Sequence, residues 1–410
     1  MLKATKDATD RAVVLDFGGE DSLVDLGSFA DVIHNHDESL SLAWQLGWET
    51  ESTQSIRTIN TPELVSMFRG KAFEISAEVV ANEGNIITRQ LAYEFAGRTF
   101  ALALRTEDKR AYDLTASGLP DFRFNRTVGR PWQLPPPVKS YAFPDQARTY
   151  YQNASFLSDL ELAYEEQINA IYYLGPLREY PKRDYYWSRS RPGDVGPSGR
   201  KTIEAILAAT EAGETRNLGF KKRYLPFQGV IAHWLREIGL IHDFRMAEIA
   251  KGSNRWIAKV VSNKGAPEVA LTDVGFGVSQ VLPVITLLYY VEPGSTVILE
   301  QPEIHLHPLA QAGLADLIVN VATHRNVQVI LESHSEHLLL RLQRRIAEGL
   351  ISQSDVSLYF CDAEKGTSRL SELELDLLGR ITNWPPKFMG DAFEETFRAE
   401  EARLKRSGAA

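Results

Sequence analysis

Cysteine is almost absent from this sequence of 410 residues, and long hydrophobic runs are absent altogether. The one cysteine, Cys361, excludes a disulfide within the chain and a zinc site built only from cysteines, and it fits a reducing compartment. No apolar run approaches the roughly 20 residues that span a bilayer, and residues 1–17 lack the apolar core of a secretory signal. We therefore expect a soluble cytoplasmic protein that does not associate with a membrane.

The sequence also lacks an excess of positive charge. Its 45 Lys and Arg residues are outnumbered by 54 Asp and Glu residues, which gives a net charge of −9. This balance disfavours a protein that mainly coats nucleic acid, although it leaves room for a local basic patch. The hydrophobic share of 44% is ordinary for a globular protein, and the length suffices for two or more domains.

The hydrophobic pattern changes along the chain. Residues 40–61 and 71–105 alternate apolar and polar side chains, which is typical of half-buried antiparallel strands. Residues 155–173 have the pattern of an amphipathic helix. From residue 278 onward, long helical patterns alternate with short buried strands, the last of them VSLYFCD at 356–362. That order predicts a mainly parallel sheet with helices on its faces.

Polar side chains directly follow one of these buried strands. The stretch VILEQPEIHLHP (297–308) places Glu300 and Gln301 at the strand's end. In nucleoside triphosphatases such a strand delivers an acid to the Mg²⁺ beside the β- and γ-phosphates, and a second polar residue positions or deprotonates the attacking water. The alternative is a strand that ends in a solvated turn.

A glycine-rich helix start precedes this strand. Gly275 and Gly277 flank Phe276, and Ser279 and Gln280 open an apolar helix. Glycines allow close backbone approach, and the amino end of a helix favours a phosphate. The alternative is an ordinary glycine turn with a serine cap.

A second polar strand end follows the first. In VQVILESHSEH (327–337) a buried strand leads to Glu332 and His334, and the interval from Glu300 leaves room for one crossover helix. A histidine at this position can hydrogen-bond a γ-phosphate, whereas the alternative is a capping Ser-His turn. The three motifs in this order are far less expected by chance than any one of them alone.

Taken together, these motifs resemble the carboxyl half of an ABC-type ATPase head, in the branch that contains the SMC-like and OLD-type ATPases. VGFGVSQVLP resembles the signature motif, VILEQPEIHLHP the Walker B strand with its following loop, and ILESHSEHLL the strand of the switch histidine. VDLGSFADVIHNHD and YYLGPLREYPKRDYY resemble a bacterial subgroup of predicted AAA-type ATPases with a carboxyl-terminal domain of unknown function.

The resemblance implies ATP and Mg²⁺ as ligands and a role for each matching residue. Glu300 would hold the Mg²⁺, Gln301 would occupy the catalytic-base position, and His334 would be the switch histidine. The signature residues would contact the nucleotide held by the other head, so that ATP lies between two heads of a homodimer. These signature residues are Gly275, Gly277, Ser279 and Gln280.

Gln301 departs from the family pattern, in which most relatives have glutamate. An amide orients water but takes no proton, and general-base help is worth about 10²–10⁴-fold in rate. We therefore expect slow turnover, or a substitute base, for which Glu303 is the candidate. The alternative is a long-lived ATP switch.

The phosphate loop of the family, G-x-x-x-x-G-K-[ST], is missing from the printed sequence. The nearest stretch, GDVGPSGRKT (193–202), has Arg200 between Gly199 and Lys201 and follows no apolar strand. In relatives the loop lies upstream of VDLGSF. We therefore consider three explanations: a start codon placed too far downstream or a truncated gene, a loop on a partner chain, and a degenerate head that no longer binds ATP.

Other constellations give weaker predictions. Glu303, His305, His307 and His334 have the residue types of a zinc site, although Pro302 and Pro308 bracket the histidine pair. A basic surface at 221–223 and 178–191, with interleaved aromatic residues, could grip nucleic acid, or it could be a solvated loop or a lid near the nucleotide. Within it, Arg178 is a candidate for a phosphate contact. The chain after His334 is too short for an OLD-type nuclease domain, so any nuclease or effector activity would belong to a partner.

The sequence thus predicts an α/β fold. It would have a mainly parallel ABC ATPase sheet, an antiparallel β portion and a helical insert, with the first β–loop–α unit missing. The expected function is an ATP-binding and ATP-hydrolysing switch in DNA maintenance or phage defence. The alternative is a truncated or degenerate head that acts as a non-enzymatic interaction subunit. The predicted divisions are an amino-terminal remainder of the core (1–150), a helical insert or lid (151–250), the ATPase core (251–362) and a tail domain (363–410).

Overall fold

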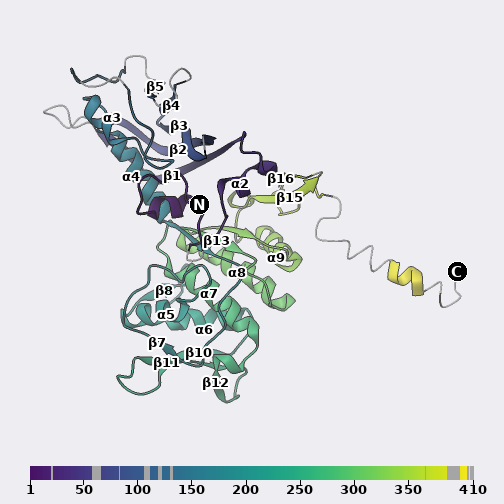
Figure 1. Cartoon of the computed structure of the whole chain (residues 1–410). Helices are drawn as coiled ribbons and strands as arrows, with labels where there is room; N and C mark the ends of the chain where they lie inside the picture. The colour runs from purple at the N-terminus through teal and green to yellow at the C-terminus, as the bar shows by residue number, and fades with distance from the viewer. Residues whose placement is uncertain are drawn as a thin grey trace. The chain divides into compact units, whose positions relative to one another are not determined.

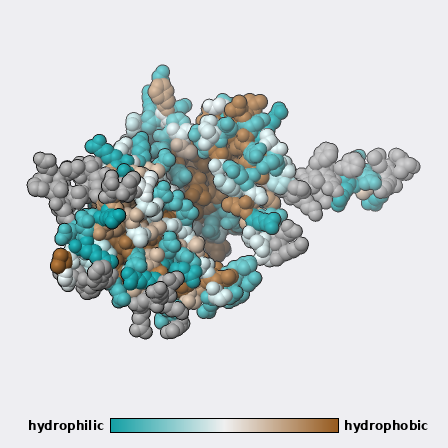
Figure 2. Space-filling model, turned by 90° about the horizontal axis from the view of Figure 1, so that it is seen from above, coloured by the Kyte–Doolittle hydropathy of each residue, from teal (hydrophilic) through white to brown (hydrophobic). Residues whose placement is uncertain are grey.

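The computed structural model divides the chain into two compact units, Met1–Ile171 and Tyr172–Ala410 (Figure 1). The structure describes residues 1–19, 22–57, 66–82, 84–105, 111–118, 122–129, 133–364, 366–385, 398–403 and 406. Among these residues, no helix is both long and apolar enough to cross a membrane. On the face seen in Figure 2, hydrophilic and hydrophobic residues are interspersed.

The first unit is built on a five-stranded antiparallel sheet in which sequence neighbours pair in the order β1-β2-β3-β4-β5. Alternating side chains on these strands face a core that contains Ile75, Leu91 and Phe100. The antiparallel portion predicted from residues 40–105 is therefore confirmed for the strands within it, while residues 58–65 and 83 lie outside the described residues. The strands are β1 Ser41–Arg57, β2 Ser66–Asn82, β3 Asn85–Phe95, β4 Arg98–Leu104 and β5 Tyr112–Ser117.

Helix α4, Leu157–Asn169, supplies the helical part of this core. It buries Leu157, Leu160, Tyr164 and Ile168, whose spacing places them on one face of the helix. A helix is confirmed within the predicted range 155–173, but it ends at Asn169, and residues 171–173 belong to strand β6. The other helices of the unit are short: α1 Leu2–Asp7, α2 Phe29–Val32, η1 His34–His36 and α3 Asp145–Tyr150.

The second unit contains a small sheet with the strand order β14-β13-β6. Strands β13, Thr296–Glu300, and β14, Gln328–Glu332, pair in parallel, with Glu300 opposite Glu332. Helix α8, Pro308–Arg325, connects them, as parallel pairing requires. The remaining parts of this layer are β6 Ile171–Leu174, α7 Phe276–Tyr290 and α9 Glu336–Ala347.

Antiparallel pairs make up most of the other strands in this unit. Strand β11 pairs with β10, β12 and β7, and two further hairpins are formed by β8 with β9 and by β15 with β16. The strands are β7 Tyr185–Tyr186, β8 Thr215–Asn217, β9 Tyr224–Pro226, β10 Asp243–Glu248, β11 Arg255–Val261, β12 Glu268–Ala270, β15 Leu358–Glu364 and β16 Thr367–Leu373. The helices are α5 Thr202–Glu211, α6 Phe227–Glu237, η2 Leu271–Asp273 and η3 Gln353–Asp355.

The mixed α/β fold agrees with the sequence prediction, but the parallel sheet is smaller than expected. The stretch VSLYFCD does not join it, because Leu358–Glu364 pairs antiparallel with Thr367–Leu373. The segment 151–250 holds α4, α5 and α6 but also several short strands. Periodicity reports which side chains are buried, and it does not report which strand lies alongside.

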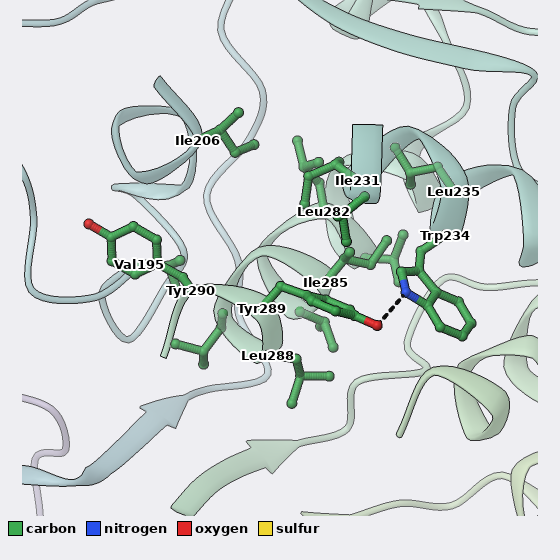
Figure 3. Packing of buried hydrophobic residues seen from close by; sticks show 14 of the residues in the cluster. Val195, Ile206, Ile231, Trp234, Leu235, Leu282, Ile285, Leu288, Tyr289 and Tyr290 are labelled. Carbon is green, nitrogen blue, oxygen red and sulfur yellow. Dashed lines mark hydrogen bonds between the residues drawn. The ribbon is translucent and has the colours of Figure 1, made fainter. Parts of the chain in front are cut away.

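Helix α7 is the centre of the core of this unit. Every residue from Val278 to Tyr290 is buried. Figure 3 shows Leu282 and Ile285 of this helix beside Ile231 of α6 and Tyr289 pointing toward Trp234. The Trp234 indole N–H donates to the Tyr289 hydroxyl at 2.8 Å, which in turn donates to Asn320 Oδ1 at 2.7 Å. The helix that carries the glycine-rich motif is thus held firmly at its far end.

Candidate functional site

The candidate site lies where β13 and β14 end. Because the two strands are parallel and in register, their carboxyl ends meet at one edge of the sheet. The main-chain N–H of Gln301 donates to the main-chain carbonyl of Glu332 at 3.0 Å, which continues the pairing one residue past β13. Gln301 has φ of 43°, a left-handed conformation that is uncommon outside glycine and recurs at functional sites.

Two side chains at this edge are directed by local hydrogen bonds. Gln301 Nε2 donates to Glu332 Oε1 at 3.2 Å. Tyr173 on β6 hydrogen-bonds Glu300, and burial, followed by the charge of Glu300, raises the pKa of the Tyr173 hydroxyl to about 12. Glu300 remains half-buried.

His334 lies at the same edge, and its side chain is exposed to solvent. Its imidazole is 79% exposed, and Nε2 lies 3.7 Å from Glu332 Oε1. The next helix begins at once, since Ser335 caps α9 by accepting from the Leu338 N–H at 3.0 Å. This cap fixes the backbone on the carboxyl side of His334.

Glu303 is also part of the site, but it faces inward. It is 7% exposed, and its Oε1 accepts a hydrogen bond from the main-chain N–H of His334 at 2.8 Å. Arg178, 6% exposed, donates from Nη2 to the Glu300 carbonyl at 3.2 Å. Burial lowers the pKa of the Arg178 guanidinium to about 10, against the raising effect of Glu303. The sequence alone gave no indication of these two contacts, because the motif around Arg178 suggested only a phosphate contact.

The start of α7 packs on the turn that follows β13. Gly275 is the N-cap, and a Cβ on Gly277 would lie 3.0 Å from the His305 carbonyl oxygen. The Phe276 and His305 rings meet edge to face at 5.0 Å. The glycine-rich motif and the VILEQPEIHLHP motif are therefore brought together, and Gly277 allows the close approach.

Ser279 and Gln280 are turned into the protein. The Ser279 hydroxyl donates to the Phe276 carbonyl at 2.7 Å, and both side chains are buried. Gln280 Nε2 has no hydrogen-bond partner within the described part of the chain. The Ser279 hydroxyl thus supports the helix start in this conformation.

The zinc alternative does not gain support from the geometry. His307 caps α8, since its Nδ1 accepts from the Ala310 N–H at 3.2 Å, while His305 packs against Phe276. Across the residues that the structure describes, no cluster of three or more His, Cys, Asp or Glu side chains is placed to hold a metal ion.

Acidic residues neutralise much of the basic loop considered for nucleic acid. Arg183 pairs with Asp273 at 3.0 Å and Arg189 with Glu211 at 2.7 Å, and Arg191 contacts Glu214. Trp187 is buried and is therefore no stacking platform. The loop is better described as a folded, charge-balanced connection than as an open basic surface.

Comparison with known families agrees with the motifs. Residues 144–341 match the family described as "AAA domain, putative AbiEii toxin, Type IV TA system", and residues 351–398 match "Protein of unknown function (DUF3696)". The first match contains every candidate site residue, and the second contains β15 and β16. A search of curated proteins found no match.

Solved structures of SMC ATPases are among those that the chain resembles. The SMC head domain from Thermotoga maritima is 10% identical over 74% of this chain and 74% of that one, with a TM-score of 0.32. A chain from work on ATP-driven dimerization and DNA-stimulated activation of SMC ATPases is 11% identical over 36% of this chain and 82% of that one, with a TM-score of 0.29. An Smc head domain bound to the C-terminal domain of ScpA, derived from Pyrococcus furiosus, is 10% identical over 42% and 37%, with a TM-score of 0.27.

Proposed function

We propose that this chain, which carries an ABC-type ATPase domain followed by a domain of unknown function, acts as a Mg-ATP-dependent conformational switch. The observation that supports this most is the parallel, in-register pairing of β13 with β14. It gathers Glu300, Gln301 and His334 at one edge of the sheet, where a nucleotide would meet all three.

The residues at this edge fit the chemistry of a Mg-nucleotide. Glu300 would hold the Mg²⁺, because this hard cation prefers carboxylate oxygens, and the ion would neutralise charge on the β- and γ-phosphates. The exposed imidazole of His334 would hydrogen-bond the γ-phosphate. Gln301 uses its Nε2 on Glu332, which leaves its amide oxygen to orient the attacking water. Since an amide takes no proton, we propose slow turnover.

The remaining parts of the ATP site would come from elsewhere. The phosphate loop would be supplied by sequence other than the printed residues, either upstream or on another chain. Gly275, Gly277, Ser279 and Gln280 would contact the nucleotide of a second head in a homodimer, which requires the α7 start to release Ser279. A role in phage defence or DNA maintenance, with a nuclease or effector partner, rests on analogy with the family description alone.

Calorimetric titration with Mg-ATP tests the proposal. The titration should be carried out on the chain of 410 residues and on the same chain extended into its upstream reading frame. We expect binding by a form that includes a phosphate loop. His334→Ala should weaken that binding roughly ten- to hundred-fold, the range for a charge-assisted hydrogen bond, and Glu300→Ala at least as much. Glu372→Ala, an exposed change on β16, is the matched control and should bind as the parent does.

The opposite outcome is equally informative. If a form that contains a phosphate loop fails to bind Mg-ATP, the switch proposal is wrong. The non-enzymatic interaction subunit then becomes the better description, and the motifs are retained for folding alone.

A further inference from the structure

Two buried side chains of opposite charge contact the main chain at the ends of β13 and β14. Arg178 donates from Nη2 to the main-chain oxygen of Glu300, the last residue of β13. Glu303 accepts from the main-chain N–H of His334, two residues beyond β14. Each side chain therefore holds the backbone of a candidate ATP-site residue, and neither is positioned to bind a ligand itself.

Both side chains also keep unused hydrogen-bonding atoms in the interior. Within the described residues, Arg178 Nε and Nη1 and Glu303 Oε2 have no hydrogen-bond partner. A buried charge is costly unless another charge or dipole compensates for it. Arg178 and Glu303 carry opposite charges and are both buried at this edge of the sheet, so each can compensate for the burial of the other.

We infer that Glu303 is a positioning residue that holds the backbone of His334 beside the end of β13, and that Arg178 is its counter-charge. Arg178 contacts the backbone of the Mg²⁺-directed acid, and Glu303 contacts the backbone of the γ-phosphate-directed histidine. The contacts stand by themselves, whereas their consequence for ATP rests on the proposed function.

The burial of Glu303 argues against its role as a substitute base. A general base must lie within hydrogen-bond reach of the attacking water. Glu303 is 7% exposed and one of its oxygens already accepts from His334, whereas Gln301 and His334 are the more accessible groups. Arg178 is equally enclosed, so its charge serves the interior and not a phosphate.

Amide hydrogen exchange at His334 tests the positioning role without any nucleotide. Glu303→Ala removes the acceptor, so exchange at His334 should become roughly ten- to hundred-fold faster, the factor expected for a hydrogen bond to a charged group. Glu303→Gln keeps an amide oxygen as acceptor and should retain most of the protection. Glu336→Gln, an exposed change two residues further along, is the control. Equal exchange in the parent and in Glu303→Ala would overturn the inference.

A double-mutant cycle tests the charge pairing. Glu303→Gln strands the cation of Arg178, and Arg178→Met strands the carboxylate of Glu303, so each single change should lower the midpoint of thermal unfolding. The double variant removes both charges and should unfold at a higher temperature than the sum of the two single effects predicts. Strictly additive effects would show that the two charges do not interact.

Turnover, where a phosphate-loop form hydrolyses ATP, separates a positioning residue from a base. A positioning role predicts that Glu303→Gln retains much more kcat than Glu303→Ala. If Glu303→Gln instead loses 10²-fold or more while His334 stays protected, Glu303 is the base and the inference is wrong. If no form binds ATP, the exchange and unfolding results still decide whether the contact exists.

Discussion

At the residue scale, burial and hydrogen bonding decide what each ionisable group can do. Glu303 accepts a hydrogen bond from the His334 backbone, yet the His334 imidazole is exposed and the Glu303 side chain is buried. The same logic applies in the first unit, where Glu161 on α4 accepts from the Phe143 N–H at 2.8 Å and contacts Arg148. Burial outweighs both partners and raises the pKa of the Glu161 carboxyl to about 7.

Glu161 therefore predicts a pH dependence of stability. A carboxyl whose pKa is higher in the folded state than in the unfolded state binds more protons when folded, so stability falls as pH rises from about 4.5 to about 7. Glu161→Gln should flatten this part of the stability curve, by about 1–3 kcal/mol between its ends. Urea unfolding at a series of pH values measures the effect, with the exposed Glu166→Gln on the same helix as control. An unchanged slope would show that Arg148 keeps Glu161 ionised throughout.

At the element scale, the start of α7 packs directly against the turn that follows β13. Gly277 allows the helix to approach the His305 carbonyl, whereas a Cβ on Gly275, two residues earlier, would meet no atom of the described residues within 4 Å. Phe276, which separates the two glycines in the sequence, packs its ring against the rings of His305 and Tyr180. The position of the glycine-rich motif is therefore set by contact with the strand-end turn.

This packing predicts losses of stability of different size for two similar substitutions. Gly277→Ala places a methyl group 3.0 Å from a main-chain oxygen, so the turn must shift, and we expect a loss of about 1–3 kcal/mol. Among the described residues, Gly275→Ala meets no atom within 4 Å, so it should cost less, about the value of a poorer N-cap. Denaturant unfolding compares them. A gain in stability for Gly277→Ala, as helix propensity alone would give, would mean that the turn yields freely.

At the scale of the whole molecule, each unit has its own hydrophobic core. The core of the first unit is built from the antiparallel sheet and α4, and that of the second surrounds α7. Leu91 is fully buried in the first core and Leu288 in the second. Separate cores make each unit a candidate for cooperative unfolding by itself.

Two cavity-forming substitutions test this organisation. Leu91→Ala and Leu288→Ala should each cost about 2–5 kcal/mol, and in scanning calorimetry each should lower a different transition. A single transition that both changes lower by the same amount would show that the two units unfold together. The surface change Glu372→Ala provides the baseline.

The sequence by itself determined the types of the elements and the order of the motifs. Periodicity predicted the antiparallel strands of 40–105 and the helix α4. The residues at the strand ends predicted the polar ends of β13 and β14. The family matches confirm the resemblance that those motifs suggested. These features are local, since the alternation of side chains and the residues that end a strand are written in consecutive positions.

Only the tertiary structure decided which elements are neighbours and which charges are enclosed. The hairpin of β15 with β16 limits the parallel sheet, and Arg178 and Glu303 are buried although their motifs suggested a phosphate contact and a base. The contact of Glu303 with the His334 backbone joins positions on two different strand ends. Sequence pattern cannot supply such facts, because strand partners and burial depend on residues far apart in the chain that only folding brings together.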